Sequence, residues 1–151
     1  MSVPEGAVWI TSTEKNLVTR VDPATNLVVE TIAVGKQPRF LAVGEGAVWV
    51  LNQSDGSVSR IDPKTNKVVE TIAAGVPGQG GDISAGEGSV WVTAFGFPVT
   101  RIDPATNKVA QQFVGEGGDA IRAGRGAVWL CNLKQQNVWH LDPKRIEATL
   151  P

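Results

Sequence analysis

The sequence predicts an all-β protein made of consecutive four-stranded antiparallel sheets, and three observations predict it. First, one segment of about 40 residues occurs four times, with its tryptophan and its Asp-Pro pair recurring at that spacing. Second, each copy contains short runs rich in Val, Ile, Trp and Thr, which favour strands. Third, glycine, proline and asparagine stand between the runs, where turns are expected. Four antiparallel meanders at this period are typical of the blades of a β-propeller.

The four copies of the repeat divide the chain into similar units. They occupy residues 6–32, 44–72, 88–113 and 126–150, and the last copy is shortened near its end. We predict one partial propeller domain over residues 1–151, with blades at about 1–35, 36–75, 76–115 and 116–151. Residues 1–3 align with the middle of the innermost strand of the second copy, so the first blade is expected to be incomplete. We therefore expect either a fragment of a longer protein or a fold that a partner completes.

The second copy shows the strand pattern most clearly. Its strand-like runs are residues 39–43, 47–52, 57–61 and 67–73. The second run, Ala-Val-Trp-Val, is apolar at successive positions, as expected when neighbouring blades cover both faces of a sheet. The tryptophans of this run are predicted to be structural core: Trp9, Trp49, Trp91 and Trp129. No window has the spacing of an amphipathic helix, so we expect no helix.

The repeated Asp-Pro-x-Thr-Asn segment predicts a tight hairpin loop. Its aspartate accepts hydrogen bonds from the following backbone, and its proline presets φ at the next position. Its asparagine tolerates the left-handed conformation on which such a loop ends; the three are Asn26, Asn66 and Asn107. The fourth copy has Lys-Arg-Ile after Asp-Pro and lacks the Thr-Asn pair, so its last hairpin is expected to be tighter or frayed.

Arginines on the third run are expected to form cross-strand ion pairs with glutamates on the fourth. Arg20 and Arg60 stand before the hairpin, and Glu30 and Glu70 follow it. In the third copy Arg101 meets Gln111, and in the last copy His140 meets Ala148. The glutamate is thus replaced by a neutral residue in both copies, and in the last copy the arginine is replaced by the weaker base histidine. An exposed pair of this kind contributes less than about 1 kcal/mol.

Composition excludes several classes of protein. The 14 basic and 15 acidic residues are interspersed, and no basic cluster exists to bind nucleic acid. No apolar run approaches the roughly 18 residues of a membrane span, and the first residues do not have the pattern of a signal peptide. Cys131 is the only cysteine, so no disulfide forms within the chain. The cysteine count therefore does not indicate whether the protein works in a reducing or an oxidising compartment. We expect Cys131 to be a small buried apolar residue.

A candidate ligand site lies at the mouth of the predicted central channel. Arg39, Asp82 and Asp119 begin successive inner strands and are expected to converge near the ring axis. Two carboxylates can bind a divalent cation such as Mg²⁺ or Ca²⁺, or a basic ligand. Alternatively, each aspartate accepts hydrogen bonds from the Gly-Gly turn beside it. We predict no cofactor and no catalytic residue.

Aromatic residues in the variable loops are candidate partner contacts. Phe95 and Phe97 interrupt a loop that is polar in the other copies, and they either contact a partner or pack within the loop. Trp139 replaces the Thr or Ser that other copies have on the third run. Its indole either packs locally or is buried against an adjoining subunit.

The repeated pattern Gly-Glu-Gly-x-Val-Trp-Val, followed by Val-x-Arg-Ile-Asp-Pro-x-Thr-Asn-Lys-Val, resembles the repeats of bacterial YVTN-type propellers. Within that group it looks closest to the streptogramin B lyase branch (virginiamycin B lyase-like proteins). The resemblance covers the whole chain and implies a propeller, usually of about seven blades. It also implies an elimination reaction with a histidine base and Mg²⁺ held by His and Glu. The only histidine here, His140, replaces the structural arginines, so no catalytic residue of that family carries over.

Three functions are compatible with this sequence. The first is a non-enzymatic binding or scaffold propeller that presents its variable rim to a ligand or protein partner. The second is a lyase-like or lactonase-like enzyme whose active site needs further blades. The third is a half-propeller, excised or engineered, without a function of its own. Because an open arc of blades exposes two apolar end faces, we expect closure by self-association, as a homodimer that forms an eight-bladed ring, or by blades outside this sequence. We expect neither nucleic acid nor membrane partners.

Overall fold

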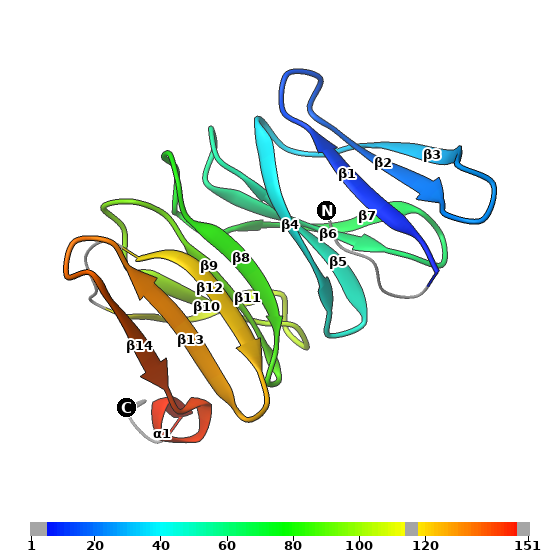
Figure 1. Cartoon of the computed structure of the whole chain (residues 1–151). Helices are drawn as coiled ribbons and strands as arrows, with labels where there is room; N and C mark the ends of the chain where they lie inside the picture. Colours follow the sequence, from blue (N-terminus) through cyan, green and yellow to red (C-terminus); the bar gives the residue numbers. More distant parts are fainter. Residues whose placement is uncertain (1–5, 114–117, 148–151) are drawn as a thin grey trace.

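The computed structural model describes residues 6–113 and 118–147, and it describes side chains as far as residue 145 (Figure 1). Within these ranges the chain forms strands joined by short turns and ends in one short helix. The elements are β1 Val8–Ser12, β2 Leu17–Asp22, β3 Leu27–Ala33, β4 Pro38–Gly44, β5 Ala47–Asn52, β6 Ser57–Asp62, β7 Lys67–Ala73, β8 Asp82–Gly86, β9 Ser89–Thr93, β10 Val99–Asp103, β11 Lys108–Phe113, β12 Gly118–Gly124, β13 Ala127–Asn132, β14 Asn137–Leu141 and α1 Pro143–Glu147.

The strands form four separate antiparallel sheets in chain order. Sheet 1 contains β1–β3, sheet 2 contains β4–β7, sheet 3 contains β8–β11 and sheet 4 contains β12–β14. Figure 1 shows the sheets following one another in a row, with sheet 1 at one end and sheet 4 at the other. The predicted all-β architecture of consecutive meanders is therefore confirmed. Residues 1–3, in which we expected part of an innermost strand, lie outside the described residues.

The Asp-Pro-x-Thr-Asn turns have the predicted geometry. Asn26, Asn66 and Asn107 all adopt left-handed φ values of 55–57°. In the first turn the Asn26 N–H donates to the Asp22 carbonyl at 2.8 Å, and the Ala24 N–H donates to Asp22 Oδ1 at 2.8 Å. These donors stabilise the ionised carboxylate, and the Ala24 N–H contributes most to lowering the pKa of Asp22 below 3.8. The equivalent N–H groups lower the pKa values of Asp62 and Asp103 in the same way.

The fourth copy departs from the expectation that the chain has no helix. Where the Thr-Asn pair is missing, the chain forms the single turn of helix α1. Asp142 caps it, because its Oδ1 accepts from the Lys144 N–H at 2.9 Å, and Pro143 supplies the preset φ of a first helical position. Without an asparagine to end a five-residue loop in the left-handed conformation, the aspartate begins a helical turn. No helix in the described ranges is long and apolar enough to cross a membrane.

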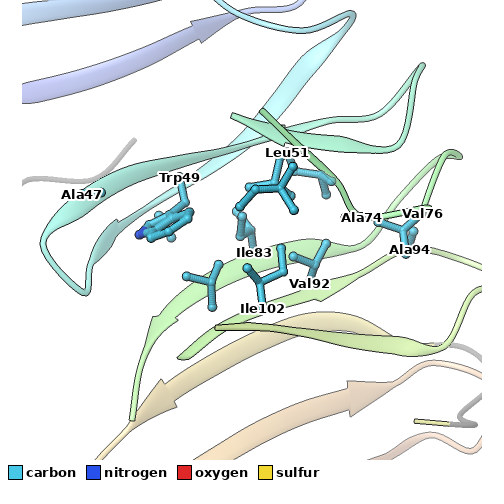
Figure 2. Packing of buried hydrophobic residues seen from close by; sticks show 13 residues of the cluster. Ala47, Trp49, Leu51, Ala74, Val76, Ile83, Val92, Ala94 and Ile102 are labelled. Atoms are coloured by element: carbon cyan, nitrogen blue, oxygen red, sulfur yellow. The ribbon is translucent and has the colours of Figure 1, made fainter. Parts of the chain in front are cut away.

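The hydrophobic core consists of three clusters, each lying between two consecutive sheets. In each cluster the tryptophan side of one sheet packs against branched aliphatic residues of the next. Figure 2 shows Trp49 and Leu51 of sheet 2 facing Ile83, Val92 and Ile102 of sheet 3. Both faces of sheets 2 and 3 are thus covered, which is why β5 and β9 are buried at every position.

Two predicted core residues of sheet 4 are exposed. Trp9, Trp49 and Trp91 are at most 1% exposed, as predicted, but Trp129 is 47% exposed. Cys131 is also exposed, contrary to the expectation that it is buried. The reason is positional: each buried tryptophan packs on the sheet that follows its own, and no described sheet follows sheet 4.

Arg20 and Arg60 join neighbouring sheets and do not form the predicted ion pairs. Arg20 and Glu30 lie opposite each other in the register, yet Arg20 Nη1 donates to the Pro63 carbonyl at 2.8 Å and to Asn66 Oδ1 at 2.6 Å. Arg60 makes the same two contacts with the turn of sheet 3. Each guanidinium also lies over the tryptophan ring of its own sheet, 5.4 Å away for Arg20 and 4.9 Å for Arg60. The prediction was wrong for Arg20 and Arg60 because their guanidinium groups cover the tryptophan and reach the Asp-Pro turn of the next sheet.

Arg101 and His140 occupy the equivalent positions in sheets 3 and 4, and each still lies against the tryptophan of its own sheet. Arg101 lies 5.8 Å from the Trp91 ring and donates to Ser89 Oγ and to Gln111 Oε1 of its own sheet. His140 lies edge-on to Trp129, with ring centroids 4.6 Å apart. The predicted position opposite His140, Ala148, lies outside the described residues.

Candidate functional site: inner strands and variable rim

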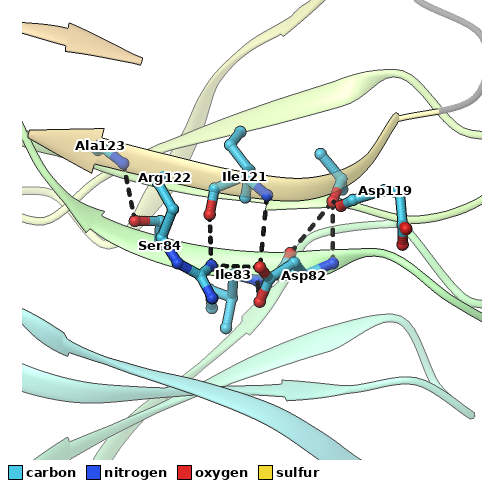
Figure 3. Close-up of polar contacts among 8 residues, drawn as sticks. Asp82, Ile83, Ser84, Asp119, Ile121, Arg122 and Ala123 are labelled. Atoms are coloured by element: carbon cyan, nitrogen blue, oxygen red, sulfur yellow. Dashed lines mark hydrogen bonds and ion pairs between the residues drawn. The ribbon is translucent and has the colours of Figure 1, made fainter. Parts of the chain in front are cut away.

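Asp82 joins the inner strands of sheets 3 and 4. It begins β8 and is 9% exposed. Its Oδ1 accepts from the Ile83 N–H at 2.8 Å, and its Oδ2 accepts from the Ile121 N–H of β12 at 3.3 Å and from Arg122 Nη1 (Figure 3). The backbone donors to Asp82 are therefore Ile83 and Ile121, and not the Gly-Gly turn beside it that the sequence offers as an alternative.

Arg122 is the charged partner that our sequence reasoning missed. It forms an ion pair with Asp82 and donates to the Ile121 carbonyl at 2.5 Å, while 69% of its side chain stays exposed. It stands opposite Trp129 in the register, and the corresponding residues of the two preceding sheets are Ala42 and Ser84. A single arginine at an inner-strand position where the other copies have small residues was the signal that could have revealed it.

Asp119 and Arg39 are not joined to this network by their side chains. The Asp119 carbonyl accepts from Thr93 Oγ1 at 2.6 Å, and Figure 3 shows its carboxylate directed away from Asp82. The Arg39 guanidinium is 5.6 Å from the ring of the adjacent Phe40. Among the described residues, no hydrogen bond or ion pair links the charged groups of Arg39, Asp82 and Asp119 to one another. The three side chains are therefore not bonded to one another, and their convergence on a ligand stays a prediction.

A shallow groove lies along the inner strands beside Arg122. It has a volume of about 210 Å³ and is lined by residues 41–43 of β4, residues 83–85 of β8 and Arg122. The guanidinium at its edge is already balanced by the Asp82 carboxylate. In residues 6–113 and 118–147, no three His, Cys, Asp or Glu side chains are grouped as metal ligands. The groove offers hydrogen-bond donors to a small polar ligand.

The loop between β9 and β10 presents an aromatic side chain on the variable rim. The Phe95 N–H donates to the Gln79 carbonyl at 3.2 Å, and the Phe97 N–H donates to the Ala94 carbonyl at 3.2 Å. Phe97 packs against the core between sheets 2 and 3. Phe95 is 42% exposed and covers Gly80, where a Cβ atom would collide with the Phe95 ring. One face of Phe95 is thus held on backbone and the other is available to solvent.

Trp139 packs within the chain. It is half-buried and lies against the cluster between sheets 3 and 4. Its burial therefore comes at least in part from its own chain, as one of our two alternatives proposed. Whether it also contacts another subunit stays a prediction.

Comparison with known proteins identifies the fold. No protein-family model and no curated protein matches the sequence. Among solved structures, the chain superposes on Kuenenia stuttgartiensis hydrazine synthase with a TM-score of 0.70 and 19% identity, covering 91% of this chain and 46% of that one. It superposes on BamB from Moraxella catarrhalis with a TM-score of 0.72 and 12% identity, covering 93% of this chain and 42% of that one. It superposes on the WD40 repeats of RRP9 with a TM-score of 0.65 and 12% identity, covering 91% of this chain and 48% of that one.

These similarities establish a β-propeller fold and no more. The chain spans about half the length of the propeller chains that it matches. Its four antiparallel sheets of three or four strands correspond to consecutive blades.

Proposed function

We propose that this chain is a β-propeller binding module that presents its variable rim to a protein or peptide partner, with a ring completed by self-association. The observation that carries the proposal is Phe95. It is a large aromatic side chain, 42% exposed, at the tip of a loop whose backbone is held by hydrogen bonds. Aromatic residues, phenylalanine among them, are enriched at the centres of protein interfaces.

The loops around Phe95 are ordered by contacts between sheets, which reduces the entropy lost on binding. Gln53 Nε2 donates to the Gly80 carbonyl at 2.5 Å, linking sheet 2 to the loop that Phe95 covers. Asp55 accepts from the Ser57 N–H and the Lys36 N–H, both at 3.0 Å. Burial opposes the ionisation of Asp55, yet the hydrogen bonds from Ser57 and Lys36 outweigh it and lower its pKa. This rim is therefore a preorganised surface built from several loops.

Most residues at the corresponding hairpin tips of the other sheets are polar, apart from Leu133 of sheet 4, which is 57% exposed, so Phe95 is an aromatic anchor on a largely polar rim. The tips contain Glu14 and Lys15 in sheet 1, Ser54 and Asp55 in sheet 2 and Lys134 and Gln135 in sheet 4. An apolar centre with a polar surround is the common composition of a protein interface. Variable loops on a rigid scaffold are also where binding residues concentrate.

A peptide-display selection tests this proposal directly. We expect a random peptide library to yield binders to the intact chain that contact the Phe95 loop. Phe95→Ala should weaken them by about 30-fold or more, the loss of one interface anchor. Lys64→Ala, on the Asp-Pro turns, is the matched control and should leave binding unchanged. Binders indifferent to Phe95→Ala, or the absence of any enriched binder, would refute the proposal.

The finer relationship of the repeats is part of the same proposal. The repeated Gly-Glu-Gly, Val-Trp-Val and Asp-Pro-x-Thr-Asn segments support descent from YVTN-type propellers near the streptogramin B lyase branch. A lyase-like or lactonase-like activity has no specific structural observation to favour it, and we do not propose one.

A further inference from the structure

We propose that the open face of sheet 4 docks on the open face of sheet 1 of a second copy of this chain, and that the reciprocal contact closes a two-chain ring. The first surface, here the Trp face, comprises Trp129, Cys131 and Val138. The second, here the receiving face, comprises Val8, Ile10 and Val28. The inference rests on the self-association in the proposed function and names the residues that perform it.

The contact proposed between two chains is already present between consecutive sheets within one chain. In the first cluster, Trp9 and Val18 pack on Val48 and Val50 of the next sheet. In the second, Trp49 and Val58 pack on Val90 and Val92. In the third, Trp91 and Val99 pack on Val128 and Leu130. Every sheet thus carries a tryptophan side and an aliphatic side, and each tryptophan side binds the aliphatic side that follows.

At the two ends of the chain the same positions are exposed. Val138 is 60% exposed, whereas its equivalents Val18, Val58 and Val99 are at most 3% exposed. On the receiving face, Ile10 is 45% exposed, and its equivalents Val50 and Val92 are 0% exposed. Val28 is 62% exposed, while Val68 and Val109, its equivalents in sheets 2 and 3, pack against the core clusters. The two end surfaces therefore expose residues of the kinds that bind each other in the interior.

The hydrogen bonds from an arginine of one sheet to the Asp-Pro turn of the next sheet also have a counterpart at the two ends of the chain, in sheets 1 and 4. Arg20 and Arg60 donate to the proline carbonyl and to the asparagine Oδ1 of the next Asp-Pro turn. Sheet 1 has this turn in the same conformation, with Asn26 at a φ of 57°. In sheet 4 the position of the arginine is occupied by His140, which lies against Trp129. The end contact is thus a version of the internal one in which a shorter side chain faces the turn.

A second internal contact is altered at the ends in a way that can be tested. Glu45 Oε1 accepts from the Gly88 N–H at 3.0 Å, and Glu87 Oε1 accepts from the Gly126 N–H at 2.9 Å, each joining one sheet to the next. In sheet 4 the corresponding residue is Arg125, which has the same left-handed φ of 57°. The glycine that would face it across the new interface is Gly6 of the second copy, whose φ is 71°. Arg125→Glu should therefore add an interaction to the proposed contact.

A second copy is the occupant that completes the fold with the fewest components. The chain covers 42%, 46% and 48% of three propeller chains, so a second copy would supply about as much chain as those proteins have beyond the matched part. Because the Trp face and the receiving face differ, each contact is head-to-tail. Two such contacts about a twofold axis close without forming a filament.

Sedimentation equilibrium on the full chain tests the proposal. We expect a dimer, and Trp129→Gln or Val28→Gln should raise its dissociation constant by about 30-fold or more, as loss of an interface anchor does. The matched controls are Val29→Gln and Val69→Gln, which replace side chains exposed to 50% and 54% outside the two faces. The controls should leave the dissociation constant unchanged, and circular dichroism of every variant should show the same strand content.

Mixing the two interface variants distinguishes head-to-tail docking from pairing of like faces. Trp129→Gln retains an intact receiving face and Val28→Gln retains an intact Trp face, so their mixture can form one unaltered contact. We expect the mixture to associate more tightly than either variant alone. We also expect Arg125→Glu and His140→Arg to tighten the dimer.

Three results would overturn the inference. They are a monomer at tens of micromolar, a series of species larger than the dimer, and a dimer that resists Trp129→Gln. A monomer that still selects peptides through Phe95 would overturn this contact and leave rim binding intact. A dimer that selects none would do the reverse, so the two proposals fail separately.

Discussion

Replacing Asp82 by alanine distinguishes a structural aspartate from a ligand-binding one. The substitution removes the acceptor of the Ile83 and Ile121 N–H groups, in residues that are 2% and 0% exposed. A buried donor without an acceptor costs about 1–3 kcal/mol, and loss of the ion pair with the largely exposed Arg122 adds less than about 1 kcal/mol. We expect the free energy of unfolding to fall by about 3 kcal/mol, which corresponds to a melting temperature lower by about 6–12 °C.

Urea denaturation followed by tryptophan fluorescence measures this effect, and Asp119→Ala is its control. The Asp119 contact in the network is made by the main-chain carbonyl, so its truncation should change the free energy of unfolding by less than about 0.5 kcal/mol. Equal losses for both variants would refute the structural assignment of Asp82. So would a melting temperature that Mg²⁺ or Ca²⁺ raises in the unaltered chain and not in Asp82→Ala.

The remaining predictions concern the contacts between sheets and the turns. Arg60→Ala should lower the free energy of unfolding by about 1–3 kcal/mol, because Arg60 bonds to the turn of sheet 3 and covers Trp49. Glu70→Ala should have little effect, and equal losses for both variants in urea titrations would support an ion pair between Arg60 and Glu70 instead. Gly81→Ala should destabilise the chain more than Gly88→Ala, since both have positive φ but only the Gly81 Cβ would meet backbone, that of Thr93; melting temperatures that fall equally would contradict this. Because the pKa values of Asp22, Asp62 and Asp103 are lowered in the folded chain, their stabilisation is fully present above about pH 4 and is lost as the pH falls through their folded pKa values. Asp62→Ala should therefore flatten the decline of stability below about pH 4, and an unchanged decline in urea midpoints would argue against the turn hydrogen bonds as its cause.

Features of short range were predictable from particular residues. The left-handed asparagines at 26, 66 and 107 follow from the Asp-Pro-x-Thr-Asn pattern, since a tight hairpin loop must end on a residue that tolerates positive φ. The burial of β5 follows from its unbroken apolar run. Even the departure at α1 arises where the fourth copy loses its asparagine, although the pattern did not reveal that Asp142 would begin a helical turn.

The candidate site was less predictable because its contacts join different sheets. Asp82 and Arg122 are separated by a whole repeat, and their pairing depends on how sheet 4 is placed against sheet 3. The expectation that Asp82, Arg39 and Asp119 converge near the ring axis stays a prediction, and it treats the starts of the inner strands as equivalent. The register instead contains irregularities between Pro38 and Phe40 and between Gly118 and Ile121, near the strand starts, which change the direction of side chains there.

The sequence alone determined the period, the strands and the turn chemistry, because these depend on residues that are neighbours along the chain or across one hairpin. The tertiary structure decided which partner each long side chain reaches. Arg20 and Arg60 bind the following sheet, Asp82 binds the sheet after its own, and Trp129 is exposed although its three equivalents are buried. Stacking of sheets sets these outcomes, because it brings together positions about one repeat apart that no local pattern connects.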